Sequence, residues 1–399
     1  MRNEDIGRAA YEAMLRRDTA WFTERLAPSI AGVLDADQLT AAFDSIRAAF
    51  GPPVRAAEPV AMGGPASGQI SMDCVGQRGE FVLLMSLDDA GLITGMNVLP
   101  KIEHPLPRYA GRDAVERAVE FAADPAFPLE GTLTLPPGGG TATAGVVLVH
   151  GSGPNDRDEA VYGAKPFLDL ALGLAARGIA TLRYDKRTRT YGRKVELDVR
   201  AEVIDDAVAA VALLRSQDGV GPVFVLGHSL GGTLAPAIAA RAEAIAGIVI
   251  VAGATRPMRE IVHAQVDHLL ATTTDELQRA SLERLRAGLE ADTGELLGLP
   301  ATYWQSLDDN GPARVAPSLR QPALVLQGGR DYQVTMADFA GWKALLPAVP
   351  ATRFVTYPEL NHLLAAGSGV STAAEYLQPC NVDQRVVDDI ADWIGEQLA

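Results

Sequence analysis

From about residue 131 to its end, the chain alternates between short apolar runs and longer segments with apolar residues at helical spacing. The predicted strands are 131–135, 144–150, 179–184, 223–227, 247–252, 323–328 and 353–357. In several of them nearly every position is apolar, as in strands buried on both faces of a parallel sheet that carries helices on both sides. We therefore predict an α/β fold with a mostly parallel sheet for this part of the chain.

The first 104 residues differ from this pattern. Apolar residues at helical spacing predict helices first, the last of them at 37–50, before Gly51-Pro52-Pro53. The apolar period then changes to two, which predicts short strands. These strands are 54–62, 68–75, 79–87 and 92–99. We expect residues 1–104 to form a small α+β domain of helices followed by an antiparallel meander, and residues 105–399 to form a second domain.

The net charge and the hydropathy of the chain argue against nucleic acids and membranes as its main partners. The 399 residues include 50 Asp and Glu against 35 Lys and Arg, so the formal net charge is −15. Nucleic acids and anionic membrane surfaces attract clustered Lys and Arg, and we expect neither as the main partner. Apolar stretches such as 245–254 are too short for the ~20 residues of a membrane span, and the polar N-terminus lacks the apolar segment of a secretory signal. We expect a cytoplasmic protein.

The two cysteines, Cys74 and Cys380, have neither the number of a disulfide scaffold nor the spacing of a metal site. Because only six histidines are present and no cysteine pairs accompany them, we expect no structural zinc. We likewise expect no bound cofactor.

The most informative motif is Gly227-His228-Ser229-Leu230-Gly231, which lies between the apolar run at 223–226 and an apolar helix. It matches Gly-x-Ser-x-Gly in the strand–turn–helix context that gives the pattern its meaning. Glycine at the flanking positions avoids clashes between a sharp turn and the neighbouring strand and helix. The turn would present the Ser229 hydroxyl as a nucleophile at the carboxyl end of the strand. A chance glycine-rich turn is the alternative.

A serine nucleophile needs a base that accepts its proton and an acid that orients the base. Of the six histidines, His362 follows the last predicted strand on a polar loop late in the chain, and we assign it as the base. Asp331 follows an apolar strand and a Gly-Gly turn, and we assign it as the acid. Asp308 and Asp309 compete for this role, but no strand precedes them.

An oxyanion hole requires backbone N–H groups that point at the substrate carbonyl oxygen as it becomes negative. The Leu230 N–H directly follows the nucleophile at a helix start, and we assign it as one donor. The other should come from the turn after strand 144–150, where glycines allow the backbone to approach a substrate. We assign the Ser152 N–H, with Gly151 and Gly153 as alternatives. A phosphate-binding loop is the rival interpretation, but the Walker lysine and the Gly-x-Gly-x-x-Gly spacing are missing.

Two charged segments, 156–159 and 185–187, follow predicted strands on the active-site side. They could bind a polar substrate, but we favour ion pairs between them that fix the loops. The helical stretch 256–299 interrupts the alternation of strand and helix. We predict a helical cap at about 256–309 that covers the pocket, and packing against the sheet edge is the plainer interpretation of the same residues.

Residues 115–399 resemble the α/β-hydrolase superfamily, in which the triad runs in the order of Ser229, Asp331 and His362 here. More narrowly, segments 151–159 and 183–187 are similar to bacterial carboxylesterases grouped with the dienelactone-hydrolase-like enzymes. Some of these enzymes carry a small N-terminal domain. The resemblance implies an α/β-hydrolase fold and carboxylesterase activity on short acyl esters. Dienelactone hydrolases themselves use a Cys nucleophile, which argues against dienelactone as the substrate here.

We therefore expect a serine hydrolase that cleaves a small-molecule carboxylic ester through an acyl-enzyme on Ser229. An acyltransferase or a thioesterase with the same triad is the first alternative, and a non-catalytic binding protein is the second. The linker at 105–107 is short, so we expect the N-terminal domain to dock on the hydrolase or on a second subunit of a homo-oligomer. Substrate-binding residues and acyl preference are not readable from the sequence.

Overall fold

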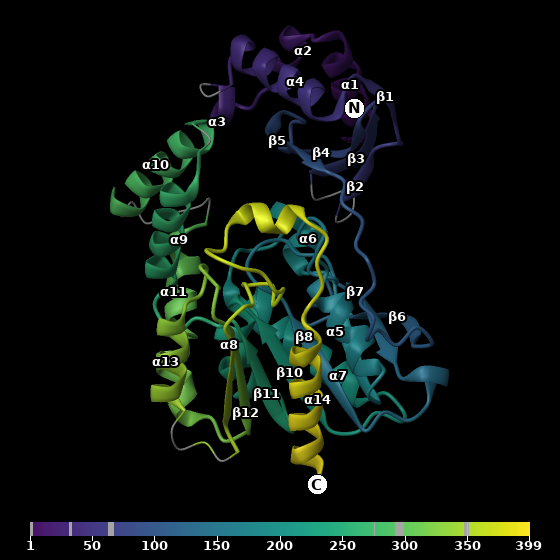
Figure 1. Cartoon of the computed structure of the whole chain (residues 1–399), viewed down its shortest axis with the longest axis vertical. Coiled ribbons are helices and arrows are strands. Elements are labelled where there is room, and N and C mark those ends of the chain that lie inside the picture. The colour runs from purple at the N-terminus through teal and green to yellow at the C-terminus, as the bar shows by residue number, and fades with distance from the viewer. Residues whose placement is uncertain are drawn as a thin grey trace. The chain divides into compact units, whose positions relative to one another are not determined.

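The computed structural model describes residues 3–31, 34–62, 68–274, 276–291, 299–346, 349 and 351–399. The chain divides into two compact units (Figure 1). The N-terminal unit consists of Met1–Glu103 and Thr188–Val195, and the C-terminal unit consists of His104–Arg187 and Glu196–Ala399. Within the part of the chain that is described, no helix has the length and apolar character to cross a membrane.

The N-terminal unit begins with helices and continues with an antiparallel sheet, which confirms the α+β prediction. Its helices are α1 (Asn3–Arg16), α2 (Thr19–Thr23), α3 (Pro28–Ala31) and α4 (Ala36–Phe50). Its strands are β1 (Pro53–Ala56), β2 (Val60–Met62), β3 (Gln69–Gly76), β4 (Gly79–Leu87) and β5 (Ile93–Pro100), in the order β1-β3-β4-β5 with β2 also on β3. Alternate residues of β3 and β4 are buried, and their apolar face packs with Phe22, Leu39 and Phe43 of the helices.

The strand predicted at 54–62 is wrong in one respect, because the structure divides it into β1 and β2. β1 pairs with the C-terminal half of β3 and β2 with the N-terminal half. Pro59 lies between the two strands and has no N–H to donate to a ladder. The continuous pairing that the apolar period implied is therefore interrupted.

The C-terminal unit is built on an eight-stranded sheet in the order β13-β12-β11-β10-β8-β9-β7-β6. The strands are β6 (Val115–Phe121), β7 (Leu129–Leu135), β8 (Ala144–Val149), β9 (Ile179–Tyr184), β10 (Val223–His228), β11 (Gly247–Val251), β12 (Ala323–Gly328) and β13 (Arg353–Tyr357). Strands β8 to β13 are parallel, whereas β6 and β7 pair antiparallel at one edge. The mostly parallel sheet is therefore confirmed. The sequence analysis missed β6, since this exposed edge strand carries charged residues where a central strand carries apolar ones.

Helices lie on both faces of this sheet, as predicted. The helices that pack on the sheet are α5 (Pro166–Ala175), α7 (Asp206–Arg215), α8 (Leu230–Ala239), α13 (Met336–Leu345) and α14 (Gln384–Leu398). Four further helices are α9 (Met258–Thr272), α10 (Glu276–Ala291), α11 (Ala301–Asp309) and α12 (Pro312–Val315). The short helix α6 (Arg187–Tyr191) lies mostly within the segment Thr188–Val195, which groups with the N-terminal unit. α5 and α14 pack on the face that includes Val146 and Leu148. Gly145, which precedes Val146 on the strand, faces Leu214 of α7, so α7 covers the opposite face. Helices α9 to α12 follow β11 as an inserted helical segment (Figure 1).

A buried carboxylate fastens the first residues of the C-terminal unit to its core. Asp169 of α5 is fully buried and faces His104 Nε2 at 2.8 Å and the Val382 backbone N–H at 2.9 Å. Burial lowers the pKa of His104, but hydrogen bonds to Asp169 and to the Gly163 carbonyl outweigh it, so the pKa is raised. Protonated His104 therefore stabilises the folded state. This contribution to the free energy of unfolding is complete below pH 6.5, the ordinary pKa of histidine, and is lost as the pH rises through the raised pKa of His104 in the folded protein.

We predict that Asp169→Asn lowers the free energy of unfolding by roughly 3 kcal/mol, because it leaves buried donors without a charged acceptor. Urea unfolding followed by circular dichroism measures this loss. Asp388→Asn is the control, since Asp388 pairs with Arg177 at a half-exposed position and should cost less than about 1 kcal/mol. Equal losses in the two variants would contradict the anchoring role.

Candidate active site

Ser229 lies on a strained turn between β10 and α8. Its backbone has φ 51° and ψ −115°, a left-handed φ that residues with side chains rarely adopt. A Cβ on Gly227 would lie 2.1 Å from the Gly231 carbonyl oxygen, and a Cβ on Gly231 would lie 2.2 Å from the Val149 carbonyl oxygen. The two glycines of the motif are therefore required for the close approach of strand and helix.

The structure brings Asp331 and His362 together at the carboxyl edge of the sheet. Ser229 follows β10, Asp331 follows β12 and His362 follows β13, and parallel strands end at the same edge. The Nδ1 atom of His362 lies 2.7 Å from Asp331 Oδ2, and both residues are about 5% exposed. Because Nδ1 donates to the carboxylate, Nε2 is the nitrogen that can accept a proton.

The carboxylate of Asp331 is fixed by further donors. Its Oδ1 accepts the backbone N–H groups of Gln333 (2.8 Å) and Val334 (2.9 Å), and its Oδ2 accepts Gln327 Nε2 at 3.1 Å. The competing carboxylates lie elsewhere: Asp309 pairs with Arg314 at 2.8 Å, and Asp308 lines a separate cavity. Of these three carboxylates, Asp331 is therefore the one that contacts His362.

His228, which precedes Ser229, connects the turn to the His362 loop. Its Nε2 donates to the His362 carbonyl oxygen at 3.0 Å, and the two rings lie 4.8 Å apart between centroids. Its Nδ1 forms an ion pair with Glu159 Oε2 at 3.0 Å. Burial lowers the pKa of His228, but the Glu159 carboxylate, the His362 carbonyl and Asp331 together outweigh it, so the pKa is raised. Burial raises the pKa of Glu159, but His228, His150 and the Gly151 N–H together outweigh it, so the pKa is lowered. The sequence analysis missed this buried pair.

The turn after β8 lies beside Ser229, as the oxyanion-hole prediction requires. A Cβ on Gly151 would lie 3.1 Å from Ser229 Cβ and 3.7 Å from Ser229 Oγ. The Gly151 N–H already donates to Glu159 Oε1 at 2.5 Å, so Gly151 is not a donor to a substrate. Leu230 is the first residue of α8, where the backbone N–H has no acceptor within the helix. Leu230 and Ser152 therefore remain the best candidates.

The charged segments pair with each other, as we favoured from the sequence. The Arg157 backbone N–H donates to Asp185 Oδ1 at 2.8 Å, and the two side chains form an ion pair. Arg183 is buried and pairs with Asp158 and Glu116. These contacts tie the turn after β8 to the loop after β9.

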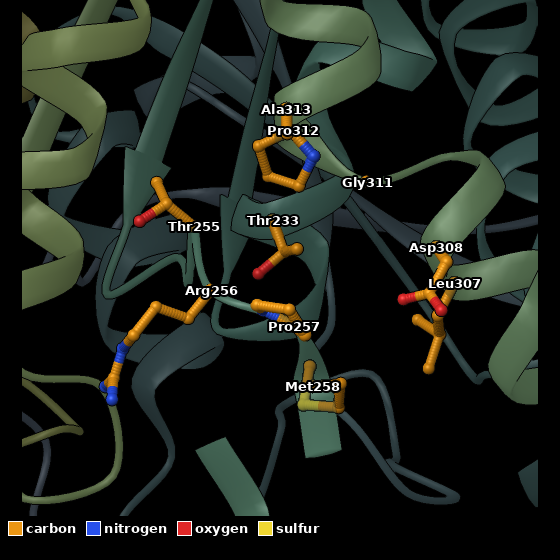
Figure 2. Close-up of a pocket in the computed structure, with 10 residues that line it drawn as sticks. All are labelled: Thr233, Thr255, Arg256, Pro257, Met258, Leu307, Asp308, Gly311, Pro312 and Ala313. Carbon is orange, nitrogen blue, oxygen red and sulfur yellow. The ribbon is translucent and has the colours of Figure 1, made fainter. Parts of the chain in front are cut away.

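The inserted helices contact the loop that carries the acid. The His268 ring of α9 stacks on Tyr332 with centroids 4.2 Å apart, and Gln265 Nε2 donates to the Gln333 carbonyl at 3.2 Å. A cavity of about 110 Å³ lies between these helices and α8 (Figure 2). It is lined by Thr233, Thr255, Arg256, Pro257, Met258, Leu307, Asp308, Gly311, Pro312 and Ala313. Thr233, one of the lining residues, donates its Oγ1 hydroxyl to the Ser229 carbonyl oxygen at 3.1 Å, so the cavity adjoins the backbone of the turn that carries Ser229.

Comparison with known proteins gives a family for this geometry. Esterase EstD of Thermotoga maritima is 40% identical over 326 residues, which are 79% of this chain and 77% of the esterase. The chain belongs to this family of serine α/β-hydrolases. A family model described as serine aminopeptidase, S33, also matches residues 141–292.

Solved structures were also compared with this chain, and the first of them shares its fold. A puromycin-hydrolyzing peptidase of Mycobacterium tuberculosis has a TM-score of 0.50 and 17% identity, and the match covers 83% of this chain and 46% of the peptidase. Est1E from Butyrivibrio proteoclasticus has a TM-score of 0.47 and 18% identity, over 70% of this chain and 98% of that one. This chain thus spans less than half the length of the peptidase.

We predict that Gly231→Ala lowers the free energy of unfolding by about 3 kcal/mol or more. The added Cβ would clash with the backbone carbonyl oxygens of Val149 and His150, which are fixed in the sheet and its turn. Urea unfolding measures the loss. Gly395→Ala in α14 is the matched control, because a Cβ there meets nothing within 4 Å and alanine favours a helix. A Gly231→Ala protein as stable as the wild type would show that the close approach at the turn is not required.

Proposed function

We propose that this serine hydrolase cleaves carboxylic esters through an acyl-enzyme on Ser229, with His362 as the base and Asp331 as the acid. The observation that carries the proposal is the strained turn at Ser229 beside the hydrogen-bonded His362–Asp331 pair. Membership of a family that contains an esterase supports an ester as the substrate. The two domains proposed are residues 1–104 and 105–399, with a cap at about 256–309.

In the acylation step, Ser229 Oγ attacks the ester carbonyl carbon while its proton moves to His362 Nε2. Asp331 stabilises the resulting imidazolium through the 2.7 Å contact at Nδ1. The carbonyl oxygen becomes negative and accepts the N–H groups of Leu230 and Ser152. His362 then donates its proton to the leaving alkoxide, and the acyl group stays on Ser229.

In the second step, water gives a proton to His362 and attacks the acyl carbon. Collapse of the tetrahedral intermediate releases the carboxylic acid, and the proton returns from His362 to Ser229 Oγ. An acyltransferase would differ only in the acceptor that takes the acyl group. Product analysis with an added alcohol separates hydrolysis from transfer, and hydrolysis predicts the free acid as the main product.

We predict that Ser229→Ala lowers kcat/KM for p-nitrophenyl acetate by at least about three orders of magnitude, because the nucleophile is lost. Ser152→Ala is the matched control. Only its backbone N–H is used, so kcat/KM should stay within about threefold of wild type. Retention of more than a few per cent of activity by Ser229→Ala would contradict the assignment of the nucleophile.

We predict that Asp331→Asn lowers kcat by up to about four orders of magnitude while the protein stays folded, since an amide favours the wrong tautomer of His362. Steady-state kinetics with the same ester measures kcat, and circular dichroism checks the fold. Asp308→Asn and Asp309→Asn are the controls. If either control lost more activity than Asp331→Asn, the acid would be misassigned.

A further inference from the structure

The carbonyl of Gly151 is held by a buried cation. Lys186 is 2% exposed, and its Nζ donates to the Gly151 carbonyl oxygen at 3.0 Å. Its charge is balanced by Glu202, whose Oε1 lies 3.0 Å from Nζ. Asn155 Nδ2 donates to the same carbonyl at 3.2 Å. A fully buried lysine is costly to maintain, and this one is directed at the backbone of one turn.

The N–H of Gly151 is held by a buried anion. Glu159 is 3% exposed and accepts this N–H at 2.5 Å, while its other oxygen pairs with His228. Glu159 itself has φ 51°, a backbone conformation that a residue with a side chain keeps only under constraint. Both polar groups of Gly151 are therefore fixed by buried charged side chains.

The peptide that joins Gly151 and Ser152 is trans, so its C=O and N–H point in opposite directions. The C=O points at Lys186, and the Ser152 N–H must point away from Lys186. Gly151 lies against the Ser229 side chain. The orientation of the oxyanion donor is thus coupled to the position of the lysine.

We propose that Lys186 and Glu159 are positioning residues that set the Ser152 N–H as oxyanion donor, a role that rests on the proposed acyl-enzyme function. Neither residue needs to touch the substrate. An oxyanion donor acts more strongly on the transition state than on the bound ester. Loss of its alignment therefore lowers kcat and leaves KM nearly unchanged.

The same contacts continue to the inserted helices. Glu202 lies in a π-helical segment, Arg200–Asp205, and its Oε2 accepts the Tyr303 hydroxyl of α11 at 2.9 Å. Tyr303 is 5% exposed. Removing the Tyr303 hydroxyl should loosen the position of Glu202, and through it of Lys186, while the lysine keeps its charge. We therefore expect this change to lower kcat by less than the loss of Lys186 does.

The test compares Lys186→Met with Asp206→Asn in the full-length protein. Asp206 forms a buried ion pair with Arg187, the residue next to Lys186, at 2.6 Å, and its carboxylate binds that side chain rather than the turn. We expect Lys186→Met to lower kcat for p-nitrophenyl acetate about 10- to 100-fold with KM within threefold. We expect Asp206→Asn to keep kcat within threefold, and Tyr303→Phe to fall between the two.

A second readout separates positioning from general damage. A trifluoromethyl ketone adds to the Ser229 oxygen, the hydroxyl proton passes to His362, and the adduct carries an oxyanion. Its affinity should fall in Lys186→Met by the same factor as kcat/KM, while the affinity of a neutral, non-reacting product alcohol stays constant. If Lys186→Met does not fold, Lys186→Met/Glu202→Gln removes both charges together and is measured in its place.

Equal kcat values for the lysine variant and Asp206→Asn, with Ser229→Ala inactive, would overturn the positioning role and leave the proposed function intact. A fall in ketone affinity no larger than the fall in alcohol affinity would overturn it as well. An active Ser229→Ala protein would instead overturn the proposed function itself.

Discussion

The left-handed backbone at Ser229 is the constraint on which the rest of the site depends. Such a conformation costs on the order of 1–3 kcal/mol and persists only where its surroundings fix it. Here the Ser229 N–H donates to the Val251 carbonyl of the neighbouring strand at 2.9 Å, and the Ser229 carbonyl accepts the Thr233 N–H at 2.9 Å. Glycines at 227 and 231 allow the backbones to meet. The buried parallel sheet therefore stabilises a turn that would be unfavourable in isolation, and the turn presents the hydroxyl.

Buried ion pairs around this turn give the loops fixed positions. Glu159 with His228 and Lys186 with Glu202 are each nearly inaccessible to solvent, and each pair also binds a backbone group of a loop at the site. Removing one member of such a pair leaves an uncompensated buried charge, which is strongly destabilising. Loops at the edge of a sheet are otherwise among its most mobile parts. In the proposed mechanism, the charge pairs hold the turn after β8 in place for a developing oxyanion.

Local patterns predicted the parallel sheet and the three residues that the structure places at its carboxyl edge, because buried strands and the Gly-x-Ser-x-Gly turn are encoded by neighbouring residues. The partners of those residues were not predictable in the same way. Lys186 and Gly151 are 35 positions apart, and His228 and His362 are 134 apart. Such pairs follow from the fold rather than from spacing. The same holds for β6, an edge strand with exposed charges, and for segment Thr188–Val195, which groups with the N-terminal unit.

The central claim is that Ser229 is the residue that becomes acylated. Reaction with a fluorophosphonate measures this directly, because the attacking serine oxygen displaces fluoride and keeps the phosphonyl group. Peptide mapping by mass spectrometry then locates the added mass. We expect one phosphonyl group per chain, on the peptide that contains Ser229, and none after the protein is unfolded before labelling. A phosphonyl group on any other serine, with Ser229 unmodified, would contradict it.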